Sequence, residues 1–131
     1  MTMLRRLRPA FSAALLVAAA AVRILAADPT QTVRLTIDYG DGVQKTFLNL
    51  EWKEKLTVFD ALKAAEKHPR GIKVEHSGSG ETIFIKTIDD APNEGQGGRN
   101  WRYSVNGEGG KVSAGIAELK PGDQIVWRYA R

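Results

Sequence analysis

Two segments of the sequence repeat the triplet Trp-Arg-Tyr, at residues 101–103 and at residues 127–129. In both segments the aromatic side chains lie two positions apart, with an arginine between them. On a β-strand this spacing puts the rings on one face and the guanidinium group on the other. Aromatic rings can fill a core or meet a flat ligand, and guanidinium groups can pair with carboxylates or phosphates. The two segments therefore indicate binding rather than bond cleavage.

The first segment carries residues that we expect at a binding surface. Trp101 opens a predicted strand directly after a glycine-rich loop at residues 95–98, and Arg99 and Asn100 lead into it. A rigid strand that meets a loop is a common place for ligand or partner contacts. The other interpretation is that Trp101 and most of the remaining rings pack in the core beneath a helix.

The arginines of the two triplets face away from the rings. Arg102 and Arg128, with Arg34 from the first predicted strand, would form a cationic stripe if the three strands are neighbours. Asp38 would offset this charge in part. The stripe is either a solvated sheet face with cross-strand ion pairs or a docking surface for an acidic ligand or partner.

Few residues suit catalysis or metal binding. The chain has no cysteine and two histidines, of which His68 would end a helix and His76 precedes a glycine turn. A hydrolase would need Asp89, Asp90 and His76 to converge in a cleft, but neighbouring residues of an extended chain point apart. No cluster of histidines or carboxylates has the spacing of a metal site. We therefore expect no catalytic residues, no metal and no resident cofactor.

The first 27 residues have the pattern of an export signal. Basic residues precede an apolar run at residues 10–22, and small residues at positions 26 and 27 offer a cleavage site. A membrane anchor is the alternative, but Arg23 interrupts a run that would need about 20 apolar residues to span a bilayer. We therefore expect an exported domain of residues 28–131, periplasmic or secreted, that is not embedded in a membrane after cleavage.

Removal of this segment changes the charge balance. The chain has 19 basic and 15 acidic residues, and the arginines at positions 5, 6, 8 and 23 precede the expected domain. The domain itself then has as many basic as acidic residues. Nucleic-acid binding is not expected, because it needs a surplus of lysine and arginine on the folded domain.

Alternating apolar side chains predict a hairpin at the start of the domain. Its strands would cover residues 32–38 and 43–52, joined by a glycine-containing turn. Three apolar residues of the second strand would share one face: Leu48, Leu50 and Trp52.

One helix follows the hairpin. Thr57 and Asp60 form a capping-box pattern at the start of residues 58–68, and Pro69 ends the pattern. Beyond the helix, strands are expected at residues 72–74, 82–88 and 101–106 and at the C-terminus, with an irregular segment at residues 89–100.

This order of elements predicts an α+β domain with a β-grasp fold, in which one helix packs across a mixed sheet. The first and last strands would lie parallel at the centre of the sheet, joined by a long crossover connection.

Four motifs in order resemble the DUF4430 family, whose domain is similar to the C-terminal β-domain of transcobalamin. The motifs are Val33-x-Leu-x-Ile-Asp-Tyr-Gly40, Thr57-Val-x-Asp-Ala-Leu62, Trp101-x-Tyr-x-Val-Asn-Gly107 and Gly122-Asp-x-Ile-x-Trp-x-Tyr129. The resemblance implies a β-grasp fold related to ubiquitin-like and soluble ligand-binding β-grasp domains. It also implies a corrinoid as a possible ligand. In the vitamin B12 carriers two domains enclose the corrinoid. We expect no helical-barrel domain before this one, so that a corrinoid would contact one half of the enclosing surface and bind more weakly.

These observations predict an exported, non-catalytic module that binds a small molecule or a cell-envelope protein. One alternative is a structural accessory domain that recognises a cell-envelope protein, and another is a hydrolase that uses Asp89, Asp90 and His76. The candidate binding residues are Arg34, Arg99, Asn100, Trp101, Arg102 and Arg128.

Overall fold

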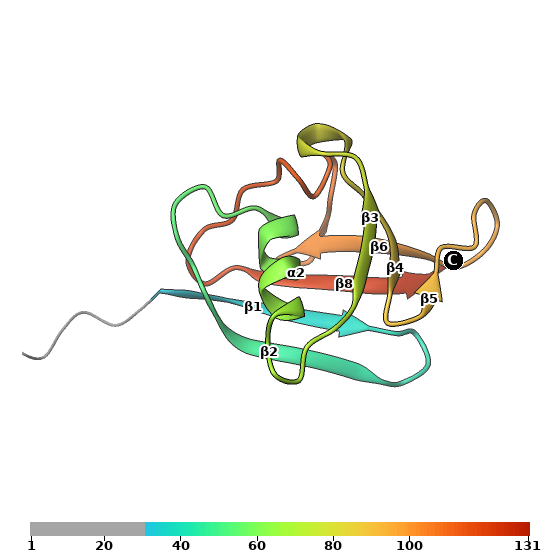
Figure 1. Ribbon diagram of the computed structural model, residues 1–131, viewed down its shortest axis with the longest axis horizontal. Helices are drawn as coiled ribbons and strands as arrows, with labels where there is room; N and C mark the ends of the chain where they lie inside the picture. The colour runs from blue at the N-terminus through green and yellow to red at the C-terminus, as the bar shows by residue number, and fades with distance from the viewer. Residues whose placement is uncertain (1–30) are drawn as a thin grey trace, which may run out of the picture.

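The computed structural model describes residues 31–131, and the export signal predicted at residues 1–27 lies outside them. Within the described range the chain forms one α-helix and two β-sheets (Figure 1). This arrangement confirms the predicted α+β class.

The larger sheet has five strands in the order β2-β1-β8-β6-β7. In its interior, β1 (Thr32–Asp38) and β8 (Gln124–Ala130) lie parallel, as the order of elements predicts. They are flanked by the antiparallel strands β2 (Gln44–Glu51) and β6 (Asn100–Val105). The short strand β7 (Glu108–Gly109) forms the edge beside β6. The two Trp-Arg-Tyr segments are therefore adjacent.

Helix α2 (Val58–Glu66) lies across one face of this sheet. The predicted capping box is present: Thr57 Oγ1 accepts from the N–H of Asp60 at 3.1 Å, and the Asp60 carboxylate accepts from the N–H of Thr57 at 3.0 Å. The helix ends two residues before the predicted end because the N–H of Lys67 bonds to the carbonyl three residues back, which tightens the last turn. None of the helical segments within residues 31–131 reaches the length and hydropathy of a membrane span.

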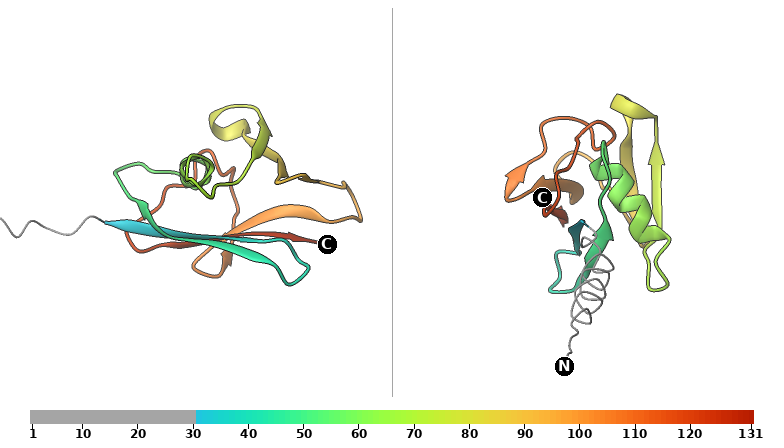
Figure 2. Two further views of the ribbon diagram at one scale, coloured as in Figure 1. Left: turned by 60° about the horizontal axis from the view of Figure 1, so that its bottom comes forward. Right: turned by 90° about the vertical axis from the view of Figure 1, so that its left-hand side faces the viewer.

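A second, three-stranded sheet lies beside the helix. It consists of β3 (Val74–Ser77), β4 (Phe84–Ile88) and β5 (Ala91–Pro92). The strand predicted at residues 82–88 begins too early, because residues Gly80–Thr82 form a 3₁₀ turn. The strand predicted at residues 72–74 lies at Val74–Ser77 instead. The second sheet and α2 lie on the same side of the large sheet, and the other face is open in the part of the chain that the structure describes (Figure 2).

Strand β2 differs from its predicted pattern. Val33 pairs with Leu50 and Leu35 pairs with Phe47, so β2 has one extra residue between these pairs and forms a β-bulge. The bulge shifts the alternation, so that Phe47 and Leu50 are buried while Leu48 is 56% exposed. The prediction that Leu48 shares a face with Leu50 was therefore wrong.

Candidate functional site

Trp101 is a core residue rather than an exposed one. The side chain is 6% exposed, and its Nε1 donates to the carbonyl oxygen of Ala91 at 2.7 Å. Its backbone N–H donates to Oδ1 of Asn93 at 2.7 Å. The segment before the strand thus folds back and covers the indole ring, and sequence periodicity gave no sign of this.

Arg99 and Asn100 shape this covering segment. The guanidinium group of Arg99 lies 4.7 Å from the centre of the Tyr129 ring, and its Nη2 donates to the carbonyl oxygen of Tyr39 at 3.1 Å. The Asn100 side chain accepts from the N–H of Gly95 at 3.0 Å and donates to the carbonyl oxygen of Gly95 at 2.9 Å. Both side chains already have partners within the domain, so these contacts explain their positions without a ligand.

The open face of the large sheet brings Arg102 and Arg128 together. The two residues are direct partners in the antiparallel pair of β6 and β8. Arg128 Nε donates to Asp38 Oδ2 at 3.1 Å. Arg34 pairs instead with Gln124 in the parallel register, four positions before Asp38 along β1. At about 3.3 Å per residue, Arg34 lies roughly 13 Å from the level of the other two arginines. The predicted stripe is therefore an adjacent pair of arginines with a third farther along the sheet.

Asp38 is the counter-charge of this pair. The N–H of Gly40, at 2.9 Å from Asp38 Oδ1, lowers the pKa of Asp38 below its ordinary 3.8, and Arg128 lowers it further, against the opposing effect of burial. The carboxylate is therefore ionised at neutral pH and neutralises Arg128. Among the ion pairs within residues 31–131, none includes Arg102.

A groove of about 740 Å³ runs along this face. Among residues 31–131, those that line the groove include three arginines and no aspartate or glutamate. One side of its wall is fixed by hydrogen bonds, since the backbone N–H of Gln124 donates to Oδ1 of Asn106 at 2.9 Å. The residues that line it with polar side chains or charges are Arg102, Tyr103, Ser104, Asn106, Gln124, Arg128 and Arg131. The groove is thus cationic and open to solvent.

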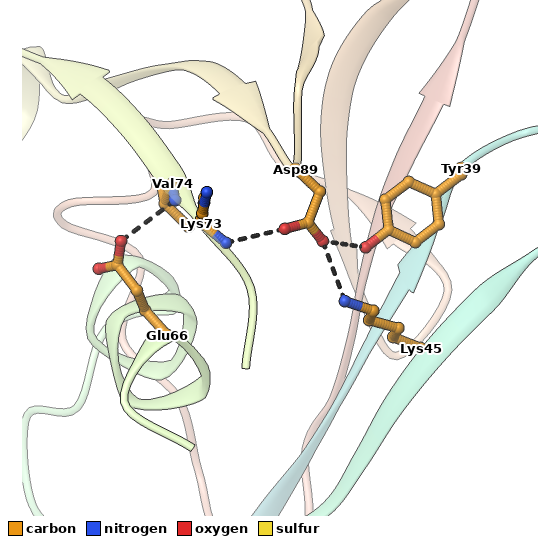
Figure 3. Close-up of polar contacts among 6 residues, drawn as sticks. All are labelled: Tyr39, Lys45, Glu66, Lys73, Val74 and Asp89. Atoms are coloured by element: carbon orange, nitrogen blue, oxygen red, sulfur yellow. Dashed lines mark hydrogen bonds and ion pairs between the residues drawn. The ribbon is translucent and has the colours of Figure 1, made fainter. Parts of the chain in front are cut away.

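Asp89 connects three parts of the fold (Figure 3). Its carboxylate accepts from the hydroxyl of Tyr39, from Lys45 Nζ at 3.3 Å and from the backbone N–H of Lys73 at 2.9 Å. Partial burial alone would raise the pKa of Asp89, but the hydrogen bonds from Tyr39 and Lys73 and the charge of Lys45 lower it below its ordinary 3.8. Burial and the bond to Asp89 raise the pKa of the Tyr39 phenol.

The residues of the hydrolase alternative have separate surroundings. The His76 ring packs edge to face on Phe59, with ring centres 4.7 Å apart. Asp89 lies at the end of β4, where its oxygens face Tyr39, Lys45 and Lys73. Residues 89 and 90 both have positive φ, which belongs to a tight turn. This arrangement favours a structural role for Asp89.

Comparisons with known proteins relate the chain to a family and a fold. The family described as "Domain of unknown function (DUF4430)" matches residues 56–131. No curated protein matches the sequence. Fifteen chains of solved structures match. One of them is a crystal structure from Ruminococcus gnavus described as a "putative metal binding protein", with a TM-score of 0.60 and 18% sequence identity, covering 77% of this chain and 97% of that chain. At this identity the likeness shows a shared fold.

Proposed function

We propose, from the premise that the chain belongs to the DUF4430 family, that this protein is an exported, non-catalytic binding module with a β-grasp fold. Its ligand or partner is anionic and binds in the groove on the open face of the large sheet. The groove residues that we assign to binding are Arg102 and Arg128, with Arg131 at the margin.

One observation supports this proposal above the others. Arg102 lies directly opposite Arg128, and like charges in this position destabilise a pair of strands. Asp38 neutralises one of the two guanidinium groups. A carboxylate or phosphate in the groove would pair with the other group and offset the repulsion, because guanidinium groups bind such oxyanions through two parallel hydrogen bonds.

The chemical class of the ligand follows from this charge. Small acidic molecules, acidic glycans, acidic peptides and an acidic surface of a cell-envelope protein all present suitable oxygens. A corrinoid with a phosphodiester group belongs to the same class, and the family resemblance supports including it. We do not carry over metal binding from the structural neighbour, because no group of three or more histidines, aspartates or glutamates lies together within residues 31–131.

A thermal-shift screen of the purified protein tests the proposal. The probes are cyanocobalamin, polygalacturonate and a polyglutamate peptide. A ligand at 100 times its Kd stabilises the native state by about 2.7 kcal/mol, which raises the Tm of a domain of this size by roughly 10 °C or more. Arg102→Gln and Arg128→Gln should each remove most of this shift, and high salt should reduce it.

Arg70→Gln is the matched control, because Arg70 is exposed and lies outside the groove. It removes the same charge and should leave the shift unchanged. Equal losses in Arg70→Gln and Arg102→Gln would mean that net charge, rather than the groove, attracts the probe. The absence of a shift with all three probes would refute the proposed ligand class.

A further inference from the structure

We propose a second binding site, for a small aromatic or aliphatic acid, in the pocket between the two sheets. The pocket has a volume of about 380 Å³ and lies where β4 is next to β6 (Figure 1). Rings of the large sheet form one wall, from Trp101, Tyr103 and Trp127, and residues 83–85 and 112–114 form the others. It lies on the covered face of the large sheet, whereas the cationic groove lies on the open face.

One residue of the pocket wall, Trp127, has an unpaired hydrogen-bond donor. Two of the three indole N–H groups have partners, since Trp52 Nε1 donates to the Leu119 carbonyl at 2.8 Å and Trp101 Nε1 donates to that of Ala91. Trp127 Nε1 has no partner within the described residues, although Trp127 is only 3% exposed. Buried N–H groups are almost always paired. Because this N–H is fully covered, a ligand acceptor would satisfy it only after a local shift of the pocket wall.

The rim of the pocket is apolar and exposed. Phe84 is 59% exposed and Val112 is 52% exposed, and both line the pocket. Burial of these side chains against an apolar body would remove hydrocarbon surface from water and favour binding. The wall behind them is fixed, because the Tyr103 hydroxyl donates to the Val112 carbonyl at 2.6 Å and the ring packs against Gly110.

The positive charge of Arg102 at the pocket favours a ligand with an anionic group. Arg102 lines both this pocket and the groove on the open face, because β7 pairs only with Ser104 and Val105 and leaves the edge of β6 free at Arg102, where the two faces meet. A molecule with an apolar body in the pocket could therefore direct an anionic group toward Arg102. The volume is near the lower end of the range for ligand pockets, about 300 to 1,000 Å³, so it suits a molecule of one or two rings rather than a macrocycle. The apolar body in the pocket distinguishes this ligand from that of the groove, although the anionic group of each reaches Arg102.

Two fluorescent probes with a shared aromatic body test the site. 8-Anilinonaphthalene-1-sulfonate has a sulfonate, and N-phenyl-1-naphthylamine lacks it. Both should bind with one site per chain, and Val112→Trp, which places a large ring at the mouth, should weaken both. Arg102→Gln should weaken the sulfonate probe about tenfold or more, as expected for loss of a charge-assisted hydrogen bond, and leave the neutral probe unchanged.

Two variants serve as controls. Leu48→Ala removes an exposed apolar side chain from β2, outside the pocket, and should change neither Kd. Arg128→Gln removes a charge from the groove but not from the pocket, so it also should leave both probes bound. Loss of polyanion binding in Arg128→Gln with both naphthyl probes retained would separate the two sites. If Leu48→Ala weakens the probes as much as Val112→Trp, they bind to exposed apolar surface and the pocket is refuted.

The indole N–H signals in an NMR spectrum give a second readout. Trp127→Phe assigns the signal of Trp127, which should move more than those of Trp52 and Trp101 when the sulfonate probe binds. A shift confined to the other two tryptophans would overturn the proposal. A dimer that moves the Trp127 signal as protein concentration rises, without probe, would also overturn it, because a second copy would then cover the pocket.

Discussion

Replacement of two buried tryptophans by phenylalanine should have unequal effects on stability. Trp101 and Trp127 lie on adjacent strands and are 6% and 3% exposed. Trp101→Phe and Trp127→Phe delete the same atoms, so the loss of buried surface and the cavity left behind should destabilise the two variants by similar amounts. The variants differ in one hydrogen bond.

The magnitude of this difference follows from the contacts. Trp101→Phe deprives the carbonyl of Ala91 of its indole donor, which lies at 2.7 Å. A buried polar group left without its partner costs about 1 to 3 kcal/mol. Trp127→Phe removes a donor that has no partner among the described residues, so it carries no such cost. We expect Trp101→Phe to lower the free energy of unfolding by about 1 to 3 kcal/mol more than Trp127→Phe does.

Urea unfolding followed by far-ultraviolet circular dichroism measures this difference, since tryptophan fluorescence would change with the substitution itself. Comparable m-values in both variants would show that unfolding exposes the same amount of surface in each. In thermal unfolding the difference corresponds to roughly 4 to 8 °C per kcal/mol for a domain of about this size. Equal losses, or a larger loss in Trp127→Phe, would refute the role that we assign to the bond between Trp101 and Ala91.

Three further predictions concern the fold and its compartment. Asp89→Asn should lower the Tm at pH 7, and the difference from wild type should shrink below about pH 4, because a carboxylate with a lowered pKa stabilises the fold above its unfolded pKa and loses this effect on protonation. A Tm difference that is the same at pH 3 and pH 7 would contradict this reasoning. Gly40→Ala should lower the Tm, because Gly40 has φ +78° and a Cβ there would collide with the carbonyl oxygen of Tyr129; an unchanged Tm would show that the turn adapts. Mature protein from an export-competent host should begin within a residue or two of Asp28, as N-terminal sequencing would show, and an intact Met1 on membrane-bound protein would overturn the predicted signal.

Local patterns in the sequence were sufficient for the framework of the fold. The capping box of Thr57 and Asp60 depends on residues three positions apart, so the sequence alone indicates it. The pairing of β1 with β8 follows from the order of elements and the short connections between the others. Alternation along β6 and β8 was also sufficient to place Arg102 and Arg128 on one face.

Features that depend on distant contacts could not be predicted in this way. The bulge in β2 exposes Leu48, and nothing in the residues of β2 itself specifies where the extra residue lies. Trp101 is buried because residues 91–93 return to bond with its side chain and backbone. Arg34 is apart from the other arginines because the parallel register sets it opposite Gln124. The pocket at Trp127 depends on the spacing of two sheets, which no local pattern encodes.

The parallel pairing of β1 and β8 also determines how the domain would resist mechanical force. Because the two strands are parallel, β1 starts and β8 ends at opposite ends of the sheet (Figure 1). Tension between residues 31 and 131 would therefore act along both strands and load the hydrogen bonds from Arg34–Gln124 to Asp38–Arg128 in shear, all at the same time. Such bonds must break together rather than one after another, so the rate of forced unfolding should be set by this pair of strands. A domain held at both ends in a cell envelope would gain resistance to stretching from the same two strands that form the centre of its sheet.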